Sequence, residues 1–139
     1  MKKTIIWLAI IALLAVLGGY IYYKATEAHA DPLESDQLKV DSKELFRMFE
    51  NFEDSANKTY AVRDKAIAVS GKIESVELAN NFYKVNLESG SDMGLVICEM
   101  DASENDKVKD LKAGTEVEII GFCNGYLMDV NLFRCKLAK

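Results

Sequence analysis

The single histidine, His29, determines which kinds of catalysis this chain could perform. It lies in a polar stretch that precedes the main domain, so the domain itself contains no imidazole. A Ser–His–Asp or Cys–His nucleophile needs a histidine base, and most catalytic zinc sites need histidine ligands. The sequence therefore favours a protein that is not an enzyme and that holds neither a metal nor a cofactor.

Three cysteines, Cys98, Cys123 and Cys135, are separated by 25 and 12 residues, and none forms a C-x-x-C pair. This spacing does not match a zinc ribbon or a thioredoxin-like redox site. In an oxidising compartment a disulfide can form, and Cys98 and Cys135 fall late in two strands that we expect to be parallel neighbours. We therefore predict either a Cys98–Cys135 disulfide or three buried free thiols.

Asp101, Ser103 and Asn105 alternate as in the first half of a calcium-binding loop. However, Asp106 stands where that loop needs its glycine, and Lys112 stands where it needs a bidentate glutamate. We interpret these residues instead as the N-cap and the acidic first turn of a short helix.

The candidate binding residues are Phe82 and Lys84, at non-core positions of one predicted strand, and Tyr126, in a predicted loop after Asn124-Gly125. Single-stranded nucleic acid binds exposed aromatic rings over a basic groove. The residues from Asp31 onward instead include 14 basic and 21 acidic side chains, a net charge of −7. This negative charge disfavours the binding of nucleic acid. For a domain outside the cytoplasm, the expected partner is an envelope protein, a glycan or a small cationic ligand.

The N-terminal segment Thr4–Tyr23 contains no charged residue and no proline over 20 residues. As a helix it would be about 30 Å long, which matches the apolar thickness of a bilayer. Ten of its side chains are Ile, Leu or Val, with Trp near one end and three tyrosines near the other. These features predict a single transmembrane helix through residues 4–23.

Lys2 and Lys3 precede this segment, whereas acidic residues predominate after Lys24. By the positive-inside rule, we expect the N-terminus in the cytoplasm and the C-terminal domain outside, in the periplasm or the extracellular space. The sequence Ala28-His29-Ala30 also resembles a signal-peptidase site, so secretion after cleavage near Ala30 is the alternative.

The predicted organisation is a signal-anchor at 1–24, a linker at 25–40 and a domain at 41–139. Asp41 and Glu44 form a capping box, and apolar residues at helical spacing extend a helix over 41–59. The period then changes to two, which predicts a β-barrel over 65–138. Its expected elements are a long strand from Ile67 bent at Gly71, strands at 82–87, 93–100, 115–123 and 126–137, and a helix at 101–111.

Five strands with a helix between the third and the fourth match the order of an OB-fold barrel. The stretches KAIAVSG, VICEM, LKAGTEVEIIGFCNG and DVNLFRC resemble the tRNA-anti-like OB-fold family over roughly residues 40–138. Its members are small bacterial proteins, often anchored or secreted, with a helix before the barrel. The resemblance implies a fold and implies no catalytic residue.

We expect a membrane-anchored extracytoplasmic OB-fold module that binds a ligand through Phe82, Lys84 and Tyr126. Two alternatives remain open. One is a nucleic-acid-binding barrel that faces the cytoplasm, and the other is a thiol-dependent enzyme, which would need an exposed cysteine of low pKa.

Overall fold

A computed structural model of the protein describes residues 2–27, 31–34 and 36–138. The chain divides into two compact units, Met1–Ala30 and Asp31–Lys139. The first contains one helix, α1 (Lys2–Glu27). Within the described part of the chain, no helix combines the length and the apolar character needed to cross a membrane. His29 and the cleavage site predicted as an alternative near Ala30 lie outside the described residues.

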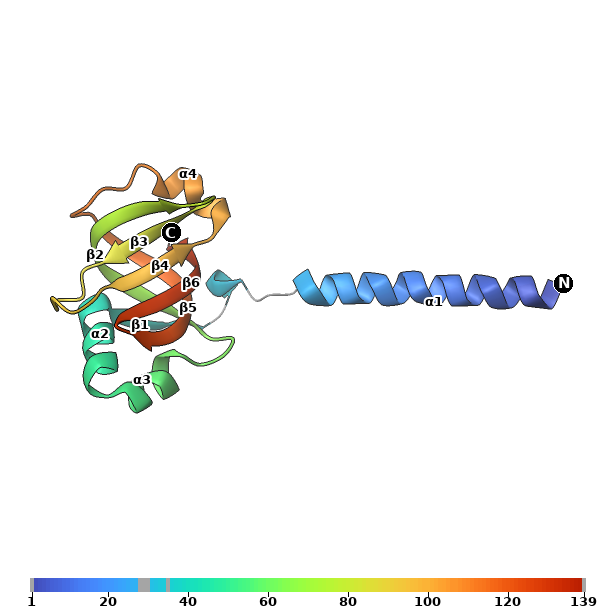
Figure 1. Ribbon diagram of the computed structural model, residues 1–139, viewed down its shortest axis with the longest axis horizontal. Coiled ribbons are helices and arrows are strands. Elements are labelled where there is room, and N and C mark those ends of the chain that lie inside the picture. Colours follow the sequence, from blue (N-terminus) through green and yellow to red (C-terminus); the bar gives the residue numbers. More distant parts are fainter. Residues whose placement is uncertain (1, 28–30, 35, 139) are drawn as a thin grey trace. The chain divides into compact units, whose positions relative to one another are not determined.

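The second unit is a closed five-stranded barrel with a few helices, as the strand pattern predicts (Figure 1). The barrel strands are β2 (Ala66–Ala79), β3 (Phe82–Leu87), β4 (Val96–Met100), β5 (Glu116–Leu127) and β6 (Asp129–Leu137). They pair in the order β2-β3-β4-β6-β5, and β5 pairs with β2 to close the ring. The β4–β6 pairing is parallel, as expected for the third and fifth barrel strands.

The helical elements differ from the prediction in their boundaries. The helix expected at 41–59 is divided at Phe52 into α2 (Ser42–Asn51) and α3 (Glu53–Tyr60). Phe52 has a non-helical backbone (φ −141°, ψ 52°), and its N–H closes α2 on the carbonyl of Met48. Between β4 and β5, a 3-10 turn η2 (Ala102–Glu104) leads into the short helix α4 (Asn105–Val108).

The segment predicted as a linker at 25–40 is partly structured. It contains a 3-10 turn, η1 (Pro32–Glu34), and a strand, β1 (Leu38–Asp41), that pairs in parallel with β2. Lys136 on β6 forms an ion pair with Asp31 at 2.8 Å, which ties Asp31 to the barrel. The contact lowers the pKa of the Asp31 carboxyl and raises the pKa of Lys136.

The turn predicted at Asn124-Gly125 is wrong, because β5 continues through these residues to Leu127. The hairpin instead turns at Met128, whose φ of 66° is in the left-handed region. Gly125 also has a positive φ, 103°, but the pairing between β5 and β6 shifts there, so this glycine forms a bulge within the ladder. Tyr126 is consequently a strand residue and not a loop residue.

Gly71 marks the bend that the sequence predicts in the long strand β2. Residues up to Lys72 pair with β5, and residues from Ile73 pair with β3, so β2 turns a corner of the barrel at this point. A Cβ atom on Gly71 would lie 2.9 Å from the Cβ of Ser42, at the start of α2. The missing side chain therefore gives the first turn of α2 room to pack against the strand.

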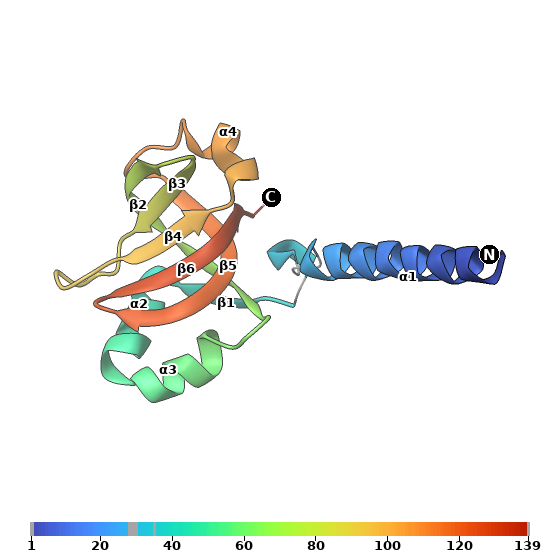
Figure 2. The same cartoon turned by 45° about the vertical axis from the view of Figure 1, so that its right-hand side comes forward.

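One continuous core fills the barrel and joins it to α2. Leu45, Phe46 and Phe49 of α2 are at most 1 % exposed and pack with the inward-facing residues of the strands. In both views, α2 and α3 lie at one end of the barrel and α4 lies at the other (Figures 1 and 2). A smaller cluster of Ala66, Ala68, Ile120 and Phe122 is buried separately.

Candidate functional site

Side chains alternate between the two faces of β3 and β4. Val85 and Leu87 are fully buried in the core, as are Val96 and Cys98. The intervening residues, including Lys84, Asn86 and Glu99, therefore belong to the outer face of the barrel. Lys84 and Glu99 are cross-strand neighbours, and their side chains form an ion pair at 3.1 Å. We call this the outer face of β3 and β4.

Asn86 is the unusual residue of this face, because only 5 % of it is exposed. Its amide nitrogen donates to the hydroxyl of Ser75 at 2.9 Å and to the carboxylate of Glu77 at 3.0 Å. Its carbonyl oxygen Oδ1 is buried and accepts no hydrogen bond from the described residues. The ionised Glu77 carboxylate can only accept hydrogen bonds. If the amide group of Asn86 were rotated by half a turn, its oxygen would face the oxygen of Glu77, so Glu77 fixes the orientation of the Asn86 amide.

The three predicted binding residues do not form one surface. Phe82 and Lys84 are two residues apart on β3 and share its outer side, where both are half-buried. The ring of Tyr126 packs against Phe46, with centroids 5.7 Å apart, and against Phe49 at 6.2 Å. Tyr126 is therefore engaged with α2.

The sequence alone does not single out Asn86, Ser75, Glu77 or Glu99 as site residues. Strand alternation was the one signal that could place Asn86 on the outer side. Its burial and its unpaired oxygen depend on cross-strand partners that the sequence does not specify.

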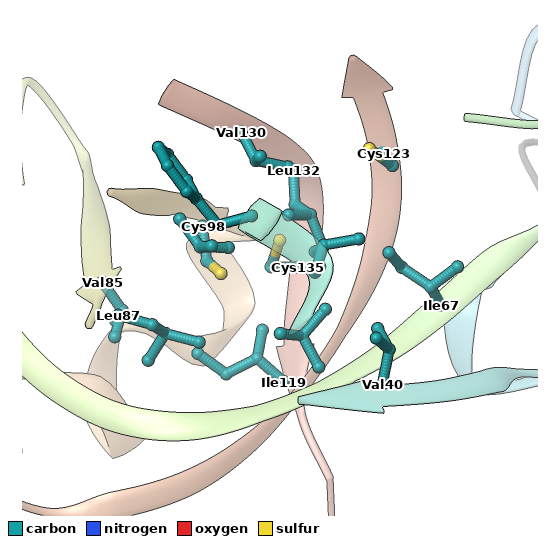
Figure 3. Packing of buried hydrophobic residues seen from close by; sticks show 14 of the residues in the cluster. Val40, Ile67, Val85, Leu87, Cys98, Ile119, Cys123, Val130, Leu132 and Cys135 are labelled. Carbon is teal, nitrogen blue, oxygen red and sulfur yellow. The ribbon is translucent and has the colours of Figure 1, made fainter. Parts of the chain in front are cut away.

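The three cysteines are buried free thiols in the structure. Figure 3 shows the sulfur atoms of Cys98 and Cys135 side by side in the barrel interior, with Cys123 farther away. Burial raises the pKa of the Cys135 thiol well above its usual range, and its hydrogen-bond partner Cys98 adds to the shift. The structure thus brings the predicted pair together, and their oxidation stays a prediction.

Thiol labelling provides a test of the cysteine-enzyme alternative. Burial raises the pKa of Cys123 to about 11. At pH 8 only about one thiol in a thousand would then be ionised, so we expect maleimide to label native protein at least about 100-fold more slowly than protein unfolded in urea. The raised pKa also makes the free energy of unfolding depend on pH, because the folded protein holds the Cys123 proton more tightly than the unfolded chain does. The stability that Cys123 contributes is complete below about pH 9 and is lost as the pH rises towards 11. Rapid labelling of native protein at pH 8 would instead support a reactive cysteine.

The Asp101 segment is a helix cap, as predicted. Asp101 Oδ1 accepts hydrogen bonds from the backbone N–H and the hydroxyl of Ser103, at 2.9 and 2.7 Å. These bonds lower the pKa of Asp101. Over the described residues, no three His, Cys, Asp or Glu side chains are grouped so that they could hold a metal ion.

Solved structures with the same fold are distant in sequence. A candidate nucleic acid-binding lipoprotein from Klebsiella pneumoniae subsp. pneumoniae superposes with a TM-score of 0.59 and 15% identity, covering 74% of this chain and 92% of that one. A candidate aspartyl-tRNA synthetase from Leishmania major Friedlin gives a TM-score of 0.50 and 11% identity, covering 73% of this chain but only 21% of the synthetase. At these identities, the likeness shows the fold alone.

No curated protein matches this sequence. A family model described as tRNA_anti-like matches residues 1–137, which is nearly the whole chain. The resemblance read from the barrel strands is thereby confirmed, and this chain belongs to the tRNA_anti-like family of OB-fold proteins.

Proposed function

We propose that this protein is a membrane-tethered binding module, without catalytic activity, whose contact surface is the outer face of β3 and β4. The observation that carries the proposal is that Lys84, paired with Glu99 at 3.1 Å, shares the outer side of β3 with the half-buried Phe82. The Lys84 and Glu99 side chains are 33% and 41% exposed, so a partner can contact them directly.

The tether and its orientation are supported by the sequence of residues 4–23. On the sequence alone, its 20 residues without a charge and its flanking aromatic residues support a membrane anchor. Lys2 and Lys3 support a cytoplasmic N-terminus and therefore a barrel outside the cytoplasmic membrane. Secretion after cleavage near Ala30 is the other arrangement consistent with the sequence.

Protease treatment of intact spheroplasts tests the orientation. We expect a C-terminal tag to be digested while the protein remains in the membrane fraction, because the barrel would face outward. Mass spectrometry of the same sample tests whether Cys98 and Cys135 form a disulfide, which lowers the mass of the protein by two hydrogen atoms. A tag that is digested only after lysis would contradict the outward orientation.

A photo-crosslinking amino acid at position 84 tests the surface. We expect it to capture a partner that is not captured from position 53, an exposed site on α3. Equal capture from the two positions, or no capture from position 84, would contradict the proposed contact surface.

Nucleic acid is the second candidate ligand. It is favoured by the Klebsiella lipoprotein, which shares the fold and whose description names nucleic acid binding. The domain charge of −7 weighs against it, and Tyr126 is packed against Phe46 and Phe49. Oligonucleotide binding that weakens steeply with added salt would support this candidate over the first.

A further inference from the structure

One part of the outer surface of the barrel is apolar and yet buried. Four side chains there, two on β2 and two on β5, are at most 7% exposed: Ala66, Ala68, Ile120 and Phe122. Their neighbours Ile67 and Val69 belong to the core inside the barrel, so by strand alternation this cluster points outward. An outward-facing apolar cluster is buried only where another part of the chain covers it.

The cover is the turn η1 (Pro32–Glu34), which packs against β2, β5 and β6 (Figures 1 and 2). Pro32 is buried in this position. The shape of the turn is set by its own hydrogen bonds. Asp31 Oδ1 accepts one from the N–H of Leu33 at 3.0 Å, and the Gln37 amide donates one to the carbonyl of Pro32 at 3.0 Å. Asp31, Pro32 and Leu33 thus form a preorganised turn on the outside of the barrel.

Two cations lie beside the apolar cluster. Lys136 is the cross-strand partner of Ile120, and its ammonium donates to Asp31 Oδ2 at 2.8 Å. The guanidinium of Arg134 lies 5.9 Å from the centroid of the Phe122 ring. The hydrogen bond from Lys136 lowers the pKa of Asp31, and the charge of Arg134 adds to this effect. We call the four apolar residues together with Arg134 and Lys136 the η1 surface.

The backbone of Arg134 is unusual for a strand, because its φ of 52° is in the left-handed region. The pairing of β5 with β6 shifts between Ile120 and Phe122, so that Arg134 and Cys135 lie opposite Gly121 alone. Bulges of this kind redirect side chains and are frequent beside binding sites, where strained backbone also concentrates. With Cys135 in the core, the bulge allows Arg134 to reach the ring of Phe122 on the outer side.

We propose that the η1 surface is a docking site for a protein segment in which an aspartate precedes a proline, and that Asp31–Leu33 is the intramolecular ligand that such a segment displaces. The partner segment supplies a carboxylate to Lys136 and a compact apolar ring to the outward cluster, a charge pattern that two cations in a domain of net charge −7 favour.

The intramolecular turn is held weakly enough to exchange. Its ion pair is partly exposed, at 38% for the Asp31 side chain and 21% for that of Lys136, and exposed pairs contribute little to stability. The η1 surface uses β2, β5 and β6, so this inference goes beyond the function proposed for the outer face of β3 and β4 and does not depend on it.

NMR titration of the ¹⁵N-labelled full-length protein in neutral detergent micelles tests the inference, with a peptide of residues 30–37 as the probe. The double variant Asp31→Ala/Pro32→Gly empties the η1 surface of its own turn. Because a short tether gives that turn an effective concentration of about 1 mM or more, we expect the double variant to bind the peptide at least about tenfold more tightly than wild type. The amide signals of Ile120 and Lys136 should shift. Binding no tighter than that of wild type would overturn the inference.

A charge exchange in the double variant provides a second test that damage to the fold cannot imitate. Adding Lys136→Glu should weaken binding of the peptide at least about fivefold, because two carboxylates then face each other. The same variant should bind a peptide that carries Asp31→Lys more tightly than the unchanged peptide. Lys58→Glu, an exposed site on α3, makes the same change in net charge and should leave the unchanged peptide preferred. If Lys136→Glu does not reverse the order of the two peptides, the inference is wrong.

Discussion

Replacing Phe46 with alanine should lower the free energy of unfolding of the barrel unit by about 3 to 5 kcal/mol. Phe46 is 1% exposed and belongs to the core that joins α2 to the strands. Its ring packs edge-on against Tyr126, so truncation removes an aromatic contact and leaves a cavity. Urea unfolding of the full-length protein in micelles, followed by the near-ultraviolet circular dichroism of its tyrosines, measures the loss.

Phe52→Ala is the matched control for this prediction. Phe52 lies between α2 and α3 and is 56% exposed, so its truncation should change the unfolding free energy by less than about 0.5 kcal/mol. Similar losses in the two variants would show that α2 is not packed into the core as described.

Gly71→Ala should cost about 1 to 3 kcal/mol, the usual range for overpacking. The added methyl group would collide with the Oγ and the Cβ of Ser42, while Leu87 lies at an ordinary 3.6 Å. Ser42 cannot easily move away, because it is 1% exposed and its hydroxyl donates to the carbonyl of Glu88 at 2.7 Å.

A double-mutant cycle with Ser42→Gly identifies the cause of this loss. Ser42→Gly alone sacrifices the hydrogen bond to Glu88, which is worth about 1 kcal/mol. In the double variant the collision is absent, so its loss should be smaller than the sum of the single losses by about 1 to 2 kcal/mol. Additive losses would show that the glycine is needed for backbone conformation and not for space.

The barrel could be predicted because each of its long strands carries a local signal. Period-two alternation in β2 places Ile67, Val69 and Ile73 on the core side whatever the partner strand is. The start of α2 was also encoded locally, since Asp41 accepts a hydrogen bond from the N–H of Lys43. The second half of the expected capping box did not form, because Glu44 binds Arg47 through two hydrogen bonds of 3.0 and 2.7 Å.

Elements that depend on distant partners were not predictable. Strand β1 is only four residues long, and its pairing with β2 joins residues 29 positions apart, such as Leu38 and Ile67. The Asn124-Gly125 pair shows the opposite error, in which a strong local turn signal is overridden by the β5–β6 ladder. The positive φ of Gly125 serves a bulge, and the turn occurs at Met128.

The candidate site was predictable only to the level of the strand face. Alternation placed Lys84 correctly on the outer side of β3. It could not reveal that Asn86 is buried there, because its partners Ser75 and Glu77 follow a shift in the pairing of β2 with β3 after Ile73. A register irregularity of this kind is set by packing in the finished barrel.

The closed ring of strands also bears on how the protein behaves when many copies are crowded together. Open strand edges are templates for intermolecular pairing and aggregation. Among the described strands, β1 alone has a single partner strand, so its outer side is the one edge at the end of the sheet order. That edge is four residues long and carries the exposed Lys39 and Asp41. Closure of the barrel thus leaves a neighbouring copy little backbone to pair with, which protects the domain against edge-to-edge aggregation at high concentration.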